Sequence, residues 1–97
     1  LAPTFTAQNG TTIHNCIAWR IGGIVFLTIQ ISIPVLISGT IVATISGIPA
    51  PFNKVFQVAG NSNETLDLSL ETNCSVKIAG DNNSARNWLA CTFVYAA

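Results

Sequence analysis

The chain has 97 residues, of which 49 % are hydrophobic and 8 % are charged, and its formal net charge is zero. This length supports one domain with a modest core, and a neutral chain gives no reason to expect a nucleic acid or an anionic membrane surface as a partner. Soluble domains usually have about 25 % charged residues, so a small monomer with so few would not cover its surface. We therefore expect further copies of the chain to bury part of it.

The first residues are polar and lack a clear period, so residues 1–11 are expected to form an irregular tether ahead of a single domain at residues 12–97. Leu1 stands where a start Met would, and no charged segment followed by an apolar one comes after it. We expect the chain to be a piece of a longer protein, with any targeting signal outside it.

Residues 12–20 predict the first strand, because alternate side chains would fall on opposite faces. Gly22 and Gly23 then predict a turn, since a glycine pair tolerates positive φ. One face of the strand would carry Ile13, Asn15, Ile17 and Trp19, and the other would carry His14, Cys16, Ala18 and Arg20.

Residues 21–53 carry no charge, and an apolar stretch of this length is the usual sign of a membrane-spanning helix. Its period favours strands instead. Every odd position from 25 to 33 is apolar, whereas positions 28, 30 and 32 are polar, and residues 40–46 alternate in a similar way. We predict an antiparallel pair of strands, 24–33 and 40–46, at the centre of the domain. A membrane protein with a helix over residues 21–45 is the alternative.

The second half of the chain predicts four more strands, over residues 54–59, 64–71, 74–79 and 88–95, after a proline-containing connection at 48–51 and with a polar loop at 80–87. Inward positions would be Leu66, Leu68, Leu70, Val76, Ile78, Leu89, Cys91, Phe93 and Tyr95, while Thr65, Asp67, Ser69 and Glu71 would face outward. Seven short strands without any 3.6-residue apolar period predict an all-β sandwich or barrel.

No motif for catalysis, for a metal or for a cofactor is present, so we predict a protein that is not an enzyme and holds no cofactor. Cys16, Cys74 and Cys91 lack the spacing of metal ligands. Cys74 and Cys91 fall on apolar faces, so we expect reduced core thiols in a protein made in a cytosol. His14 has no partners for metal binding or general-base catalysis and is expected at the surface or an interface.

Four Asn-x-Ser/Thr sequons, at Asn9, Asn63, Asn73 and Asn82, are expected to occur by chance in a chain rich in Asn, Ser and Thr.

Several stretches of the chain are similar to the head domain of bacteriophage receptor-binding proteins and tail-fibre tips, those of lactococcal siphophages above all. They are Trp-Arg-Ile-Gly-Gly-Ile-Val-Phe at 19–26, Thr-Ile-Val-Ala-Thr-Ile-Ser-Gly-Ile-Pro at 40–49, Glu-Thr-Leu-Asp-Leu at 64–68 with Val-Lys-Ile at 76–78, and Trp-Leu-Ala-Cys-Thr-Phe-Val-Tyr at 88–95. The resemblance covers residues 12–97. It implies a small antiparallel Greek-key barrel or sandwich, assembly as a homotrimer, and binding of a host-surface saccharide near the subunit borders.

The resemblance also implies saccharide-binding residues, which in this chain are Thr65, Asp67, Lys77, Arg86 and Trp88. The family carries a His-x-Asp pair that would fall on Thr65 and Asp67, so only the Asp is kept. Lys77 stands about where the family has a Trp, and Arg86 and Trp88 are offset from the family's Arg.

The residue chemistry supports three of these positions on its own, each with an alternative. Asp67 would project from the outer face of a strand and could accept hydrogen bonds from neighbouring sugar hydroxyls. The alternative is a solvated charge or a cross-strand partner for Lys77. Trp88 follows a polar loop and could stack on a sugar ring. Otherwise it would pack on the core or on a trimer axis. Arg86 lies in that loop with Asp81, Asn82 and Asn83, and loops on a rigid scaffold often carry recognition. The alternative is an ordinary solvated turn.

Three functional hypotheses follow from the sequence. The first is a trimeric receptor-binding head at a phage tail tip or baseplate. It would be made in the host cytoplasm and would act outside it, binding a saccharide without nucleic acid and without insertion into a membrane. The second is a structural β-module of a fibre, pilus or capsid that serves assembly alone. The third is the membrane protein described above.

Overall fold

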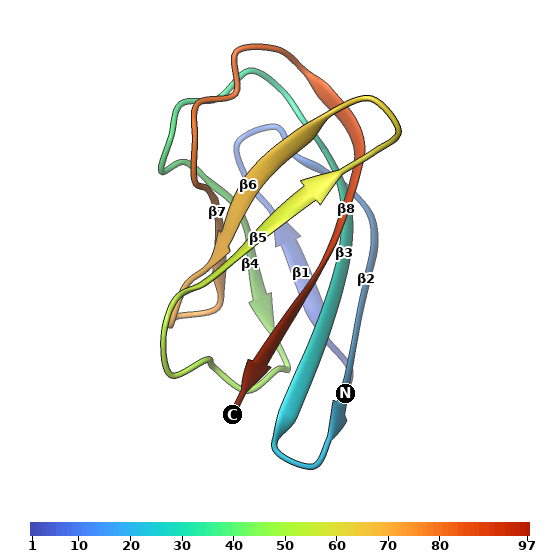
Figure 1. The fold of residues 1–97 in the computed structure, drawn as a ribbon, viewed down its shortest axis with the longest axis vertical. Coiled ribbons are helices and arrows are strands. Elements are labelled where there is room, and N and C mark those ends of the chain that lie inside the picture. The colour runs from blue at the N-terminus through green and yellow to red at the C-terminus, as the bar shows by residue number, and fades with distance from the viewer.

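A computed structural model describes all 97 residues of the chain. Eight antiparallel strands and no helix form a nearly closed, barrel-like sheet, which confirms the prediction of an all-β fold (Figure 1). The strands are β1 (Thr4–Ala7), β2 (Thr12–Ile21), β3 (Ile24–Ile33), β4 (Ile41–Ser46), β5 (Val55–Gly60), β6 (Thr65–Leu70), β7 (Ser75–Ile78) and β8 (Arg86–Ala96).

The order of strands around the sheet is β1-β4-β7-β6-β5-β8-β3-β2. Strands β5, β6 and β7 follow one another as neighbours, while β4 returns to lie beside β7, which is a Greek-key arrangement. The two edge strands, β1 and β2, lie near each other, so the sheet almost closes on itself (Figure 1).

The uncharged stretch forms strands β3 and β4, and no helix of the structure has the length and hydropathy needed to cross a bilayer. The predicted pairing of these two strands is wrong. Strand β3 pairs with β2 and β8, whereas β4 pairs with β1 and β7. Alternation determines which face of a strand is buried but leaves its neighbours open, and the segment from Pro34 to Thr40 carries the chain to the other side of the barrel (Figure 1).

The expected irregular segment at residues 1–11 contains a strand, so this part of the prediction is wrong for residues 4–7. Strand β1 pairs along β4, from Thr4 opposite Ser46 to Ala7 opposite Ala43. Only Phe5 of β1 packs against the core, so the sequence holds little alternation from which a strand could be predicted. The backbone groups at the edge of β4 hold the segment in place.

The core lies inside the barrel and confirms the predicted inward faces. It consists mainly of aliphatic side chains from β3, β4 and β6, together with Leu89, Phe93 and Tyr95 of β8. A large apolar side chain contributes about 1.5–3 kcal/mol when fully buried. Its fully buried members with the largest side chains include Phe93, Leu27, Ile29, Ile31, Leu68, Leu70, Ile78 and Leu89.

Strands β5 and β8 are neighbours in the sheet but share a single register pair, Gly60 opposite Ala90. The proline-containing connection between β4 and β5 includes the buried Pro51. The hydroxyl of Tyr95, near the end of β8, donates a hydrogen bond to Pro49 O at 2.7 Å. The hydrogen bond holds the connection against β8. Proline has no backbone N–H to donate, so a connection outside the sheet is a suitable place for it.

Candidate functional site

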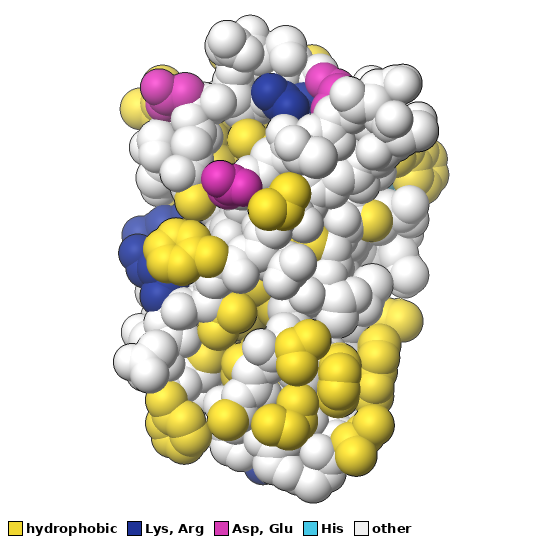
Figure 2. All heavy atoms as spheres, in the orientation of Figure 1, with side chains coloured by type: hydrophobic (Ala, Val, Ile, Leu, Met, Phe, Trp, Pro, Cys, Tyr) yellow, Lys and Arg dark blue, Asp and Glu magenta, His cyan; other side chains and the backbone are white.

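The outer face of β5, β6 and β7 carries Asp67 and Lys77, and Lys54 and Glu71 lie at the ends of these strands. The register places Asp67 of β6 beside Val58 of β5, and Ser69 between Phe56 and Lys77. Because Leu66 and Leu68 fill the inward positions of β6, the alternation of the strand turns Asp67 outward. In Figure 2, acidic, basic and apolar side chains lie close together over these strands.

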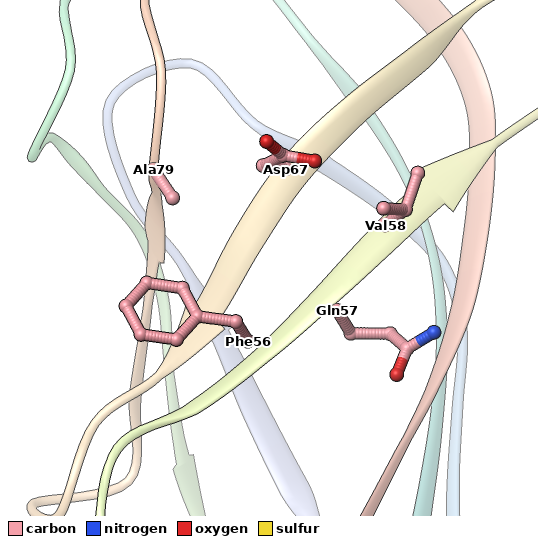
Figure 3. A pocket seen from close by; sticks show the side chains of 5 residues that line it. All are labelled: Phe56, Gln57, Val58, Asp67 and Ala79. Carbon is pink, nitrogen blue, oxygen red and sulfur yellow. The ribbon is translucent and has the colours of Figure 1, made fainter.

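A depression of about 450 Å³ lies on this face and is lined by Phe56, Gln57, Val58, Asp67 and Ala79 (Figure 3). Phe56 and Val58 are 65 % and 53 % exposed, so this face carries two neighbouring apolar side chains in contact with solvent. The Asp67 carboxylate takes part in no hydrogen bond or ion pair of the structure, so both of its oxygens are free to accept. We refer to this feature as the Asp67 depression.

A cluster of charges adjoins the Asp67 depression. Oε1 of Glu71 lies 3.2 Å from Nζ of Lys54 and 3.6 Å from Nζ of Lys77, and the Lys54 ammonium lies 5.8 Å from the centroid of the Phe56 ring. Burial raises the pKa of the Glu71 carboxyl, but hydrogen bonds from Ser69 and Lys54 and the charges of both lysines lower it by more. Its pKa therefore lies below the ordinary value of 4.5.

Lys77 therefore pairs with Glu71, and the alternative that made it the partner of Asp67 is wrong. The register explains the difference, since Lys77 stands opposite Ser69, two positions along β6 from Asp67. Ser69 faces outward as predicted but is only 3 % exposed. Phe56 and Lys77, its cross-strand neighbours, flank it on the outer face.

Arg86 connects the loop between β7 and β8 to the first residue of β6. Its Nε donates to Asn82 Oδ1 and its Nη1 donates to Thr65 O, both at 2.6 Å. Asn82 is fully buried, and its amide in turn donates to Pro34 O at 2.6 Å. These contacts give Arg86 a structural task, and they use the backbone of Thr65 while its side chain stays exposed.

Trp88 lies elsewhere, on the outer face of β8, and does not line the Asp67 depression. It has a positive φ of 56° and is 54 % exposed. Its indole stacks on the imidazole of His14, with ring centroids 3.6 Å apart and planes inclined by 13°. The five residues suggested by the sequence therefore do not form one site. Asp67 lines the depression, Lys77 belongs to the adjoining charge cluster, Arg86 binds Asn82 and the backbone of Thr65, and Trp88 stacks on His14.

Sequence reasoning missed Phe56 and Val58, which line the Asp67 depression. The signal was present, since Val55, Phe56 and Val58 place apolar side chains on both faces of one short strand. Phe56 and Val58 lie two positions apart on the same outer face, and it is such adjacent exposed apolar side chains, more than single ones, that mark an interaction surface.

The outer face of β2, β3 and β8 carries a patch that we call the apolar face. In register, Trp19 stands opposite Phe26 and Phe26 opposite Val94, and the rings of Trp19 and Phe26 stack at 5.4 Å. The patch consists of Ile17, Trp19, Ile21, Ile24 and Val94, which are 40–65 % exposed, together with Phe26. It has no charged member.

The three cysteines are free, and Cys74 and Cys91 are buried, as predicted from their positions on apolar faces. Burial raises the pKa of the Cys91 thiol to about 12 and that of Cys16 to about 11. High thiol pKa values keep these side chains protonated and weakly nucleophilic near neutral pH. No group of three or more His, Cys, Asp or Glu residues is placed to hold a metal ion.

Neither a protein-family model, nor a curated protein, nor a solved structure matches this chain. The features that bear on function are therefore the Asp67 depression, the His14–Trp88 stack and the apolar face.

Proposed function

We propose that this protein is the receptor-binding head of a phage tail fibre or baseplate, a homotrimer that binds a cell-surface saccharide and catalyses no reaction. The observation that carries the proposal is the unpaired Asp67 carboxylate beside the exposed ring of Phe56. A sugar offers one face of C–H groups and a rim of hydroxyls, and these two features match an aromatic ring and a free carboxylate.

The neighbouring groups support this use of the depression. Ala79, which lies across Asp67 from Val58, lines it with only a small side chain (Figure 3). Hydroxyl donors bonded to a carboxylate make charge-assisted hydrogen bonds. Each such bond replaces one to water, so the net gain is about 1.5–3 kcal/mol at most, and binding at one depression is weak.

Assembly into trimers would compensate for weak binding at each site. The apolar face supports assembly, because exposed patches of this kind on a small protein mark interaction surfaces. Three depressions held on one trimer then raise the overall avidity without new contacts.

A second candidate function is a structural module that serves assembly alone. The apolar face favours it as well. So does β2, a ten-residue strand at the edge of the sheet that pairs on one side only, with β3, and could pair with a strand of another chain on its free edge. This function requires nothing of Asp67, and the unpaired carboxylate is the reason to prefer the first proposal.

The test is binding of host cell-wall saccharide to the wild-type protein, to Asp67→Asn and to Glu64→Gln, measured by biolayer interferometry on oligomers of equal size. Both substitutions remove one negative charge and exchange one oxygen for an amide nitrogen, but Glu64 lies outside the depression. We expect Asp67→Asn to bind at least tenfold more weakly and Glu64→Gln to bind like the wild type. Equal binding by all three proteins, or no binding by the wild type, would contradict the proposal. Assembly without saccharide binding would favour the structural module.

A further inference from the structure

Two strand irregularities meet at Ser32. On one side β2 has a bulge, where His14 is the extra residue between the pairs Ile13–Ile31 and Asn15–Gln30. On the other side the register between β3 and β8 shifts beyond the pair Ile31–Leu89, so that Ser32 faces the irregular start of β8. Bulges re-aim side chains, and these two bring the rings of His14 and Trp88 together over one serine.

Ser32 fixes the position of both aromatic residues. Its Oγ accepts a hydrogen bond from the backbone N–H of Trp88 at 3.0 Å and lies 2.6 Å from Nε2 of His14. The stack and the two hydrogen bonds hold the indole in one orientation before any ligand arrives. A fixed aromatic ring loses little conformational entropy on binding.

Burial in the core does not explain why Trp88 adopts this backbone conformation. A bulky residue at positive φ is strained, and the Trp88 side chain does not gain a place in the core in return, since half of it is exposed. Backbone strain of this kind gathers at ligand-binding sites, where it forms part of the mechanism.

The surroundings of the stack are polar and uncharged. The next row of outward positions on the same three strands consists of Asn15, Gln30 and Ala90, which stand opposite one another in register. Two amides supply donors and acceptors, and the exposed Ala90 adds only a small side chain to this row. The nearest charged residue along β8 is Arg86, whose guanidinium is bonded to Asn82 and Thr65.

We propose that the exposed face of Trp88, backed by His14 and bordered by Asn15 and Gln30, is a second binding site for an uncharged sugar ring. The ring stacks its C–H face on the indole and places its hydroxyl or acetamido groups on the two amides. That the ligand is a saccharide rests on the proposed function, but the site itself is separate from the Asp67 depression. It binds the sugar hydroxyls through neutral amides, whereas the depression binds them through a carboxylate.

The test uses fluorescence, because Trp19 and Trp88 are the only tryptophans. In a Trp19→Phe background, which keeps an aromatic ring beside Phe26, Trp88 alone reports on binding. The probes are gluco-, galacto- and chito-oligosaccharides. We expect at least one probe to shift the Trp88 emission with a saturable dose response. The variant Asn15→Ala/Gln30→Ala should weaken that response at least tenfold, while its thermal unfolding shows that it folds.

Three outcomes would overturn the inference: no probe shifts the emission, the amide variant responds like its parent, or Asp67→Asn abolishes the response. The last outcome would mean that Trp88 senses binding at the depression. Binding of host saccharide in the absence of a Trp88 response would leave the proposed function standing and remove the second site. Conversely, Asp67→Asn could leave the binding of every saccharide unchanged while the Trp88 response persists. That result would remove the Asp67 depression as a site and keep the site at Trp88.

Discussion

The imidazole of His14 lies flat on the indole of Trp88, with 3.6 Å between the ring centroids. The two residues come from opposite ends of the chain, and β3 lies between their strands. The contact exists because both strands depart from regular pairing where they meet Ser32. The stack is one of the few features that compensate the left-handed backbone of Trp88.

Substitutions at Trp88 separate the strain from the stack. Trp88→Ala keeps the left-handed backbone and loses the stack, so we expect it to lower the free energy of unfolding by about 1–2 kcal/mol. Trp88→Gly also loses the stack, but glycine adopts the φ of 56° without strain. The glycine variant should therefore be more stable than the alanine variant by about 1 kcal/mol in urea denaturation. An alanine variant of equal or greater stability would show that the backbone there is unstrained.

Arg86 is expected to act on stability and not on binding. Arg86→Lys can satisfy only one of the two acceptors, Asn82 Oδ1 and Thr65 O, and leaves the other without its donor. We expect a loss of about 1–3 kcal/mol in the free energy of unfolding, with unchanged saccharide affinity of the folded protein. The opposite pattern, full stability with lost affinity, would return Arg86 to the binding site.

Glu71 predicts how stability depends on acid. Its pKa is lowered in the folded protein from the ordinary value of 4.5, so the folded state binds its proton more weakly than the unfolded state does. The stabilisation is complete well above pH 4.5 and is lost as the pH falls through the lowered pKa of the folded state. Thermal unfolding of the wild type and of Glu71→Gln from pH 7 to pH 2.5 measures this. We expect the difference between the two proteins to shrink with acid, and a constant difference would contradict the assignment.

The apolar face predicts which substitutions disrupt assembly. Val94→Lys places a charge beside Phe26 at the centre of the face, where desolvation on assembly would be costly. Val58→Lys is the matched control, because Val58 is similarly exposed but lies at the Asp67 depression. Light scattering should give a trimer for the wild type and the control and a monomer for Val94→Lys. A trimer that survives Val94→Lys would assign the interface to another surface.

Period-2 alternation predicted the strands well because a buried inner face demands apolar residues at every second position. Strands β2 to β8 lie close to the predicted ranges, and Leu66, Leu68 and Leu70 are buried while Asp67 is exposed. The neighbours of β3 and β4 could not be predicted, since pairing depends on how the connections cross the barrel. Strand β1 buries too little to leave a pattern.

The candidate sites could be predicted only in part. The exposure of Asp67 follows from its place in a strand, but the approach of Phe56 depends on the β5–β6 register. The bulges that join His14 to Trp88 have no sequence signature here, because neither contains a glycine at the shifted position. The pairing of Arg86 with Asn82 depends on how the loop between β7 and β8 folds back.

The most direct test of the account is a map of backbone amide chemical shifts in the ¹⁵N-labelled protein during titration with host cell-wall saccharide. We expect saturable shifts at Phe56, Gln57, Val58, Asp67 and Ala79, the residues that line the depression. A titration that leaves these five amides unmoved, at saccharide concentrations that saturate binding to the protein, would contradict it.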